Sequence, residues 1–165
     1  GWIVTSEERV RDLTRIKKAM DLGCPPLMQG IAQAFLEDAE GYAAHRERIG
    51  EHYRRLRDAT LAALDRHMPK EVSWTKPAGG FQLWITLPEG FSSVELFVRC
   101  VDSGVAFIPG PLQDVDHRFA NSLRLCYGSL SESDIYEGIK RLSSAVKQYL
   151  RETPEDAGMA GLGDF

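Results

Sequence analysis

Arg124 is the residue whose type and setting most clearly point to chemistry. It falls in a predicted strand between Leu123 and Leu125, so its side chain should leave the sheet on the face opposite theirs. The planar guanidinium has the geometry for a bidentate contact with a carboxylate. A strand arginine is also common at a surface or a sheet edge, and the spacing alone leaves both interpretations open. Two loops rich in glycine and proline, 77–80 and 109–111, would let a ligand approach the backbone closely.

The other reactive side chains form no site that we recognise. The sequence lacks the GxSxG, HExxH, GxxxxGK and GxGxxG patterns of hydrolases, zinc proteases and nucleotide-binding proteins. His45 and His52 are seven residues apart in a helical pattern, but arginines surround them, which favours a solvated helix face over a metal site. The cysteines are too widely spaced for a zinc site, and we expect Cys100 and Cys126 to act as small buried apolar residues. We therefore predict no metal site.

The composition is that of a folded globular chain. Of the 165 residues, 43% are hydrophobic and 27% are charged, which argues against disorder for the bulk of the chain. No apolar run approaches the roughly 18 residues of a membrane span, and the first residues do not resemble a signal peptide. We expect a cytoplasmic protein without membrane contact. The net charge is −4, and acidic residues interrupt the arginine-rich stretch 46–57, so a solvated helix face is favoured there over a nucleic-acid surface.

The first half of the chain is predicted to be helical apart from its first residues. Trp-Ile-Val-Thr at 2–5 has the composition of a short buried strand. Because a buried strand without an initiator Met cannot begin a natural gene product, we expect a missing upstream segment. Two amphipathic helices follow, separated by Pro25 and Pro26. The longest helical pattern covers 42–67, and its length favours a connection between two domains.

In the second half the spacing of apolar residues changes from helical to extended. The predicted strands are 72–75, 81–87, 105–108 and 122–127. The first two flank the 77–80 loop, which predicts a β-hairpin. The helix between the second and third strands should bury Val94, Phe97, Val98 and Val101. Ser131 with Asp134 begins the last helix, whose apolar stripe runs from Ile135 to Tyr149. This order predicts an α/β chain whose second half is an α+β layer, a small and mostly antiparallel sheet with helices on one face.

Several stretches of the sequence, taken in order, resemble a known family. They are GWIVTSEERV at 1–10, PPLMQ at 25–29, RRLRDATLAAL at 54–64, PAGGFQLWITLPEG at 77–90, VAFIPG at 105–110 and NSLRLCYGSL at 121–130. Together they are similar to the C-terminal part of fold type I pyridoxal-phosphate aminotransferases of class I/II. The nearest subgroups are the 2-aminoadipate-aminotransferase-like enzymes and the aminotransferase-like domain of MocR-type GntR regulators.

The resemblance implies a substrate-binding role for Arg124, which matches the family arginine that pairs with the α-carboxylate of the substrate. It implies pyridoxal phosphate as cofactor, held by a lysine and an arginine just upstream of a Gly-aromatic pair, here Gly1 and Trp2. None of the lysines in the sequence sits in that motif; they are Lys17, Lys18, Lys70, Lys76, Lys140 and Lys147. We therefore expect no catalytic residue, no cofactor-binding residue and no covalently bound pyridoxal phosphate in this chain by itself.

The resemblance also implies an organisation into parts. Residues 1–41 would be a remnant of the large cofactor-binding domain, 42–68 an interdomain helix, 69–150 the small C-terminal domain and 151–165 a flexible tail. The substrates would be an amino acid and a 2-oxo acid, and the assembly a homodimer. The alternative is the effector-sensing half of a MocR-type regulator, which would contact nucleic acid only through an N-terminal domain absent from this sequence.

Overall fold

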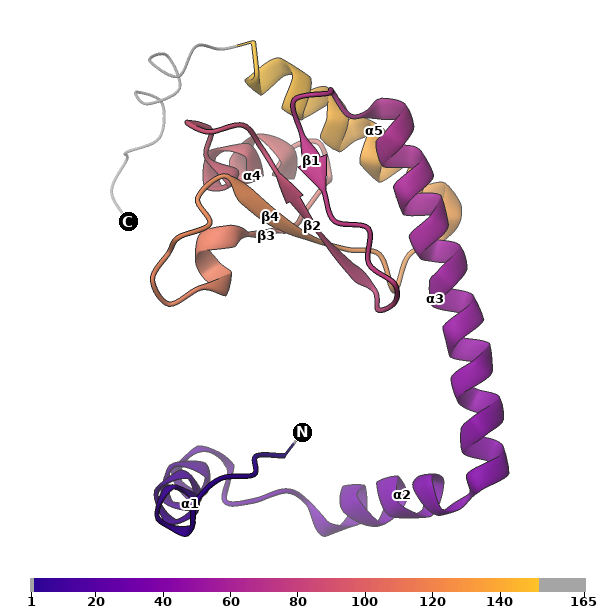
Figure 1. The fold of residues 1–165 in the computed structure, drawn as a ribbon, viewed down its shortest axis with the longest axis vertical. Helices are drawn as coiled ribbons and strands as arrows, with labels where there is room; N and C mark the ends of the chain where they lie inside the picture. Colours follow the sequence, from indigo (N-terminus) through magenta and orange to yellow (C-terminus); the bar gives the residue numbers. More distant parts are fainter. Residues whose placement is uncertain (1, 152–165) are drawn as a thin grey trace. The chain divides into compact units, whose positions relative to one another are not determined.

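The computed structural model describes residues 2–151, which divide between residues 48 and 49 into two compact units (Figure 1). The first unit holds α1 (Glu7–Asp21), α2 (Pro26–Glu37) and the beginning of α3 (Ala39–His67). After the rest of α3, the second unit continues with β1 (Ser73–Trp74), β2 (Gln82–Thr86), α4 (Ser93–Val101), β3 (Ile108–Pro109), the 3-10 helix η1 (Gly110–Gln113), β4 (Ser122–Cys126) and α5 (Glu132–Tyr149).

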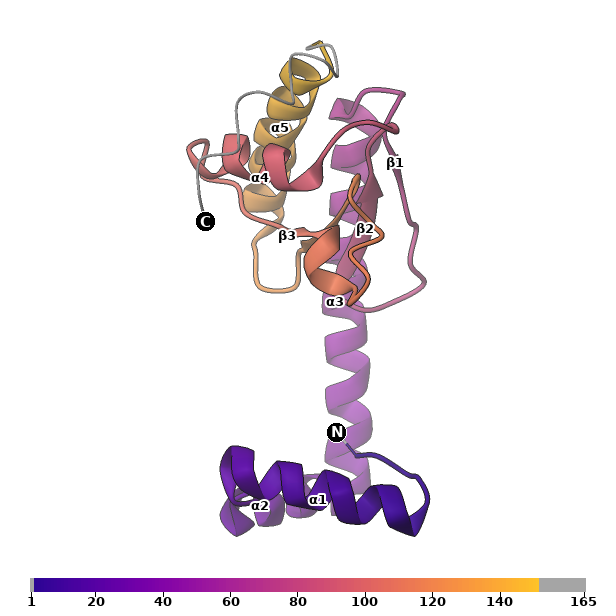
Figure 2. The same cartoon turned by 90° about the vertical axis from the view of Figure 1, so that its left-hand side faces the viewer.

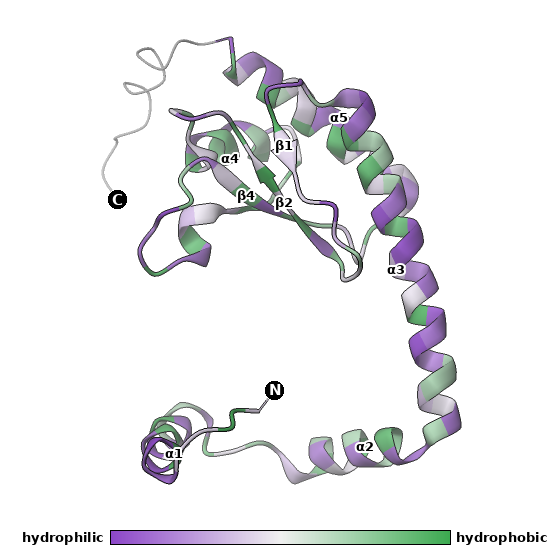
Figure 3. Cartoon of the chain, viewed as in Figure 1, coloured by the Kyte–Doolittle hydropathy of each residue, from purple (hydrophilic) through white to green (hydrophobic). Residues whose placement is uncertain are grey.

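The first unit leaves its apolar side chains uncovered. No residue from 2 to 48 is buried, although α1 and α2 both carry apolar residues (Figure 3). The strand predicted at 2–5 is wrong, because these residues have no regular structure and Trp2 and Val4 are each 89% exposed. A strand forms only where a neighbour completes its backbone hydrogen bonds, and no described strand pairs with this segment.

The long helix was predicted from residue 42 but begins at Ala39. The Asp38 carboxylate accepts a hydrogen bond from the Gly41 N–H at 3.0 Å, which satisfies a donor of the first helical turn. Near this junction the Phe35 ring packs edge-on against Tyr42 and His45, with centroid distances of 5.8 and 5.2 Å. Helix α3 ends at His67, as predicted, two residues before Pro69.

A four-stranded antiparallel sheet organises the second unit, in the order β1-β2-β4-β3. β1 and β2 form the predicted hairpin, in which Trp74 pairs with Ile85. β2 and β4 are the central strands, and their register places Trp84 opposite Arg124 and Ile85 opposite Leu123. The predicted fold class is confirmed.

One face of the sheet packs on the helices. Leu83 and Ile85 of β2 and Leu123 and Leu125 of β4 are buried in a single core. α3, α4 and α5 complete that core, with α5 supplying the predicted stripe from Ile135 to Tyr149. Figure 2 shows α3, α4 and α5 in a second view. The side chains that alternate with these leucines and isoleucines lie on the other face, where most are only partly buried. The helices therefore cover one face and leave the second available for a site.

The predicted buried face of α4 is only partly correct. Phe97 packs against the core, but Val94, Val98 and Val101 are 46%, 65% and 49% exposed, whereas Ser93, Leu96 and Cys100 are buried. Apolar residues cover two neighbouring faces of this helix, so periodicity alone could not indicate which of them packs on α5. Its beginning was predictable, because the Ser92 hydroxyl accepts the Glu95 N–H as an N-cap.

The strand predicted at 105–108 is shorter and later in the structure, at Ile108–Pro109. Gly104 has a left-handed backbone (φ 72°), and the Val105 N–H is hydrogen-bonded to the Cys100 carbonyl of α4. That bond removes the first residue of the predicted strand from the ladder. At the far end of the chain, the predicted tail at 151–165 lies outside the described residues except for Arg151. Within residues 2–151 no helix is both long and apolar enough to cross a membrane.

Candidate functional site

Arg124 occupies the middle of β4 on the sheet face that carries no helix. Its register partners are Trp84 of β2 on one side and Ile108 of β3 on the other. The strand pattern agrees with the prediction, since Leu123 and Leu125 are buried on the opposite face. Because β4 is a central strand, Arg124 is not the edge residue that the sequence left open.

The guanidinium of Arg124 has no partner among the described residues. Its Nε is shielded from solvent and makes no hydrogen bond, while the two terminal nitrogens are not shielded in this way. A buried donor without a partner is unfavourable by about 1–3 kcal/mol, and more when the group is charged. In this conformation an incoming carboxylate reaches the terminal nitrogens and not Nε. The arrangement is that of a cation available for an external anion.

Aromatic side chains border Arg124 on this face. Trp84 and Phe119 pack edge-to-face with a centroid distance of 5.6 Å and an interplanar angle of 87°. The sequence analysis did not single out either residue, although the alternation of β2 places position 84 beside position 124. Phe119 is the last aromatic residue before β4, in the segment that follows η1.

An ion pair fixes the segment between η1 and β4. Arg118 donates two hydrogen bonds to the Asp114 carboxylate, both at 2.8 Å, and its backbone N–H donates a third. These side-chain and backbone bonds from Arg118 hold the pKa of Asp114 below its ordinary value. The Arg118 guanidinium also lies 5.8 Å from the Phe119 ring centroid. The segment is therefore held by its own contacts.

The two loops that the sequence offered for close ligand approach behave differently. At Gly79 and Gly80 an added Cβ would meet nothing within 4 Å, and Gly80 has a φ of 87°, so this loop is open. Arg57 and Tyr127 hold it by hydrogen bonds to the carbonyls of Ala78 and Gly80 at 2.9 and 3.1 Å. Gly110, in the other loop, is packed against the chain's own Phe119 and Ser122 carbonyls. There the close approach is internal and leaves no space for a ligand.

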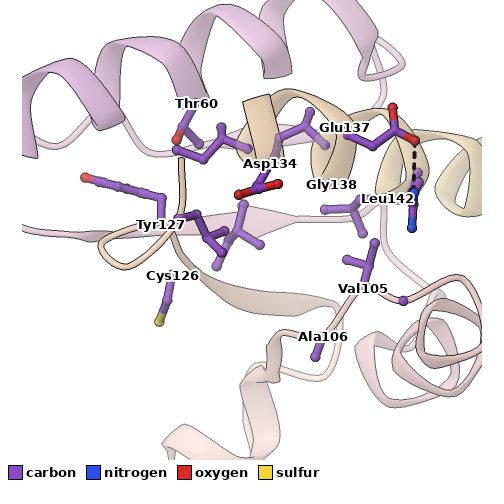
Figure 4. A pocket seen from close by; sticks show the side chains of 15 residues that line it. Thr60, Val105, Ala106, Cys126, Tyr127, Asp134, Glu137, Gly138 and Leu142 are labelled. Atoms are coloured by element: carbon purple, nitrogen blue, oxygen red, sulfur yellow. Dashed lines mark hydrogen bonds and ion pairs between the residues drawn. The ribbon is translucent and has the colours of Figure 1, made fainter. Parts of the chain in front are cut away.

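A cavity of about 340 Å³ lies elsewhere in the second unit (Figure 4). Apolar residues of β4 and α5, among them Leu125, Ile135 and Leu142, line it, and Arg124 does not. The charged groups at this cavity already have partners. Glu137 accepts from Arg141 at 2.9 Å, and Asp134 accepts from the Ser131 hydroxyl at 2.6 Å. The cavity offers no unpaired charge for a substrate, so Arg124 is the better candidate.

The two cysteines that were expected to be buried apolar residues differ in the structure. Cys100 is buried, which raises its thiol pKa to about 11, but the prediction for Cys126 is wrong because it is exposed. Alternation along β4 would have placed Cys126 on the face of Arg124. Within the described part of the chain no three His, Cys, Asp or Glu residues are grouped to hold a metal ion.

The lysines of the chain do not fit a covalent pyridoxal phosphate site. A lysine that forms a Schiff base typically lies in a desolvated pocket. Burial there disfavours the ammonium form, so that the neutral, nucleophilic amine is populated. Every lysine here is exposed. Lys17 is paired with Asp21 at 2.7 Å, and that hydrogen bond raises its pKa. The exposed setting of these six lysines therefore does not match that of a Schiff-base lysine.

Comparison with known proteins gives consistent results. The family model described as "Aminotransferase class I and II" matches residues 1–142. The 2-aminoadipate transaminase of Thermus thermophilus is 39% identical over 91% of this chain and 37% of its own length. The crystal structure of its LysN, an alpha-aminoadipate aminotransferase complexed with N-(5'-phosphopyridoxyl)-L-leucine, superposes with a TM-score of 0.78 at 38% identity, over 90% of this chain and 38% of that one. An uncharacterized HTH-type transcriptional regulator of Bacillus subtilis, YdfD, is 28% identical over 90% of this chain and 30% of its length. The chain thus spans between 30% and 38% of the length of these proteins.

Proposed function

The chain belongs to the class I and II aminotransferase family, and from that premise we propose that it is the C-terminal part of a pyridoxal-phosphate-dependent amino acid aminotransferase. The reaction would transfer an amino group between an amino acid and a 2-oxo acid, in a homodimer. The observation that carries the proposal is the unpaired Arg124 guanidinium on the sheet face that has no helix.

In this proposal Arg124 binds the α-carboxylate of the substrate through its two terminal nitrogens. Two parallel N–H···O bonds fix both the position and the rotation of the carboxylate. Holding the carboxylate fixes the direction of the bonds at Cα, which is a contribution of positioning and not of acid–base chemistry. Pyridoxal phosphate, when bound, withdraws electrons from that carbon. We assign its attachment to sequence outside these 165 residues, in agreement with the exposed lysines.

We also propose the division of labour along the chain. Residues 1–41 would pack on the rest of a large cofactor-binding domain, which accounts for the exposed apolar residues of α1 and α2. Residues 42–68 would connect that domain to the small domain at 69–150, the part with a core of its own.

A second candidate function is the effector domain of a MocR-type regulator. The similarity to a transcriptional regulator over 90% of the chain favours it. Arg124 would have the same ligand in both cases, because sensing an amino acid also requires its carboxylate to be bound. Sequencing upstream of Gly1 separates the two candidates: a helix-turn-helix module at the beginning of the gene would support the regulator.

Both candidate functions require Arg124 to bind a carboxylate, and Arg124→Ala in the full-length protein tests that shared requirement. The reaction of the bound cofactor, followed by its absorbance, is measured with an L-amino acid and with the primary amine that lacks only the carboxylate. We expect Arg124→Ala to lower kcat/KM for the amino acid by about two to three orders of magnitude, since removing one partner of a charge pair costs about 2–5 kcal/mol. The amine should react almost as before.

Arg141→Ala is the matched control, because this exposed arginine is already paired with Glu137 on α5. It should leave both substrates unaffected. If Arg124→Ala lowers the reaction of amino acid and amine equally, Arg124 does not bind the carboxylate and the proposed function loses its main support.

A further inference from the structure

We propose that Trp84 is a positioning residue that holds the Arg124 guanidinium ready for the substrate carboxylate. The inference rests on the proposed role of Arg124 and adds a residue that acts through it. Trp84 and Arg124 are direct partners across β2 and β4. Side chains at such positions leave the same face with Cβ atoms about 5 Å apart. Ile108 occupies the corresponding place on the β3 side, so Arg124 is flanked on both sides.

The need for such a residue follows from how the guanidinium is held. Arg124 makes no hydrogen bond or ion pair within the described residues, so polar contacts do not fix its conformation. Its Nε is nevertheless shielded from solvent, so surrounding protein atoms cover that end of the group. An arginine that is free to rotate must be ordered when the ligand binds, and the lost side-chain entropy lowers affinity. Neighbouring side chains that hold the arginine in place before the ligand binds reduce this entropic cost.

Trp84 is suited to this because its own orientation is set independently of Arg124. Phe119 packs edge-to-face on the indole, with centroids 5.6 Å apart. Phe119 in turn belongs to the segment that the Arg118–Asp114 ion pair fixes, with two bonds of 2.8 Å. The Trp84 backbone is tied to the residue that follows β1, since its N–H donates to the Thr75 hydroxyl at 3.0 Å. The indole is therefore a fixed wall and not a side chain that moves together with the arginine.

The experiment uses the full-length protein and compares Trp84→Leu with the unchanged protein. The same two substrates are used, the L-amino acid and its amine without the carboxylate, and kcat and KM are determined separately. We expect the KM for the amino acid to rise about 10- to 30-fold, the range that the rotamer entropy of one arginine accounts for. Neither kcat for the amino acid nor any constant for the amine should change appreciably. Trp84→Phe, which keeps an aromatic wall, should restore most of the affinity.

Trp74 provides the matched control. It lies in β1 opposite Ile85 and packs against the core on the helix-covered face. Trp74→Leu should lower stability at least as much as Trp84→Leu while leaving the preference for the amino acid over the amine unchanged. A purely structural effect of Trp84 would make the two variants behave alike, and that result would overturn the inference.

A double variant distinguishes failure of this inference from failure of the proposed function. When Arg124 is already alanine, Trp84→Leu should add no further rise in KM for the amino acid. If it adds the full effect, Trp84 acts on the substrate by another route and the positioning role is wrong, while the role of Arg124 stands. If Arg124→Ala alone does not separate amino acid from amine, the proposed function itself fails. Should Trp84→Leu not fold, Phe119→Leu decides the question, because it removes the ring that packs on the indole: an unchanged preference for the amino acid over the amine contradicts the inference.

Discussion

The two faces of the sheet differ in how deeply their side chains are buried. On one face Leu83, Ile85, Leu123 and Leu125 are almost completely buried against three helices. On the other, Gln82, Trp84, Thr86 and Arg124 are only partly buried. The strands are the same, and only the alternation of side chains separates a core from a candidate binding surface.

The difference between the two faces is also a difference in unsatisfied buried polar groups, which lower stability. Four shielded side-chain atoms in residues 2–151 have no hydrogen-bond partner: His67 Nε2, Trp74 Nε1, Ser93 Oγ and Arg124 Nε. Only the last belongs to a group that is charged at every physiological pH. An unpaired cation in a central strand does not stabilise the fold, which is why its presence is better explained by a ligand than by packing.

The largest effect should come from the covered face. Leu123 is fully buried and pairs with Ile85, so Leu123→Ala leaves a cavity that the sheet and helices cannot fill. We expect a loss of about 2–5 kcal/mol in the local unfolding free energy. Hydrogen exchange of the β2 and β4 amides in the full-length protein measures it. Val98→Ala is the control, because that valine is 65% exposed on α4 and should cost less than about 0.5 kcal/mol.

Gly110→Ala should affect the other face through the backbone. A Cβ at this position would overlap the Phe119 and Ser122 carbonyl oxygens, which are main-chain atoms and cannot rotate away. We expect a loss of about 1–3 kcal/mol and a displaced Phe119, which would loosen the contact with Trp84. Near-ultraviolet circular dichroism of the tryptophans reports that displacement. An unaltered tryptophan signal together with full stability would show that the segment yields easily and that the two faces are less distinct than we infer.

A milder change tests whether Arg124 serves binding and not stability. Arg124→Met keeps an unbranched side chain but removes the shielded Nε and the charge. We expect stability to remain the same or to rise by about 1 kcal/mol, while carboxylate binding is lost. Chemical unfolding of the full-length variant measures this. A loss as large as that of Leu123→Ala would mean that Arg124 is part of the fold's support, and the contrast between the faces would disappear.

The sequence was sufficient for those parts of the fold that depend on local pattern. Alternation predicted the β2 hairpin and the side of β4 from which Arg124 projects, and the Ser92 and Ser131 hydroxyls cap the helices that follow them. Pattern was insufficient where apolar residues cover two neighbouring faces of an element, as on α4. It also failed at residues 2–5, where a strand depends on a neighbour that the described chain does not provide.

The candidate site was predictable only in part. Strand spacing gave the direction of Arg124, and the family resemblance gave its expected ligand. That Trp84 lies directly opposite Arg124, 40 residues further along the chain, depends on the register between the two strands, which spacing within one strand does not determine. Whether Arg124 has a partner inside the chain is a property of all its neighbours together, and only the structure could supply it.

Tyr149 offers the smallest and most specific test of the covered side. Its buried hydroxyl accepts the Ser92 N–H at 3.1 Å and donates to the Glu95 carboxylate at 2.7 Å, which joins the end of α5 to the beginning of α4. Burial raises the pKa of Tyr149 to about 12, helped by Glu95 and opposed by the Ser92 N–H. Because the folded state favours the protonated phenol, this stabilisation is present below about pH 10 and is lost as the pH rises towards 12. Tyr149→Phe should lower stability by about 1 kcal/mol at neutral pH and remove part of the alkaline loss of stability.

Denaturant unfolding at about pH 9 and about pH 11 measures both effects of Tyr149→Phe. Tyr127→Phe is the control, because the pKa of Tyr127 is also raised by burial but its hydroxyl bonds to the Gly80 carbonyl and not to α4. If the alkaline loss were the same in Tyr149→Phe as in the unchanged protein, the link between α4 and α5 would not depend on the phenol, and apolar packing alone would hold the covered face together.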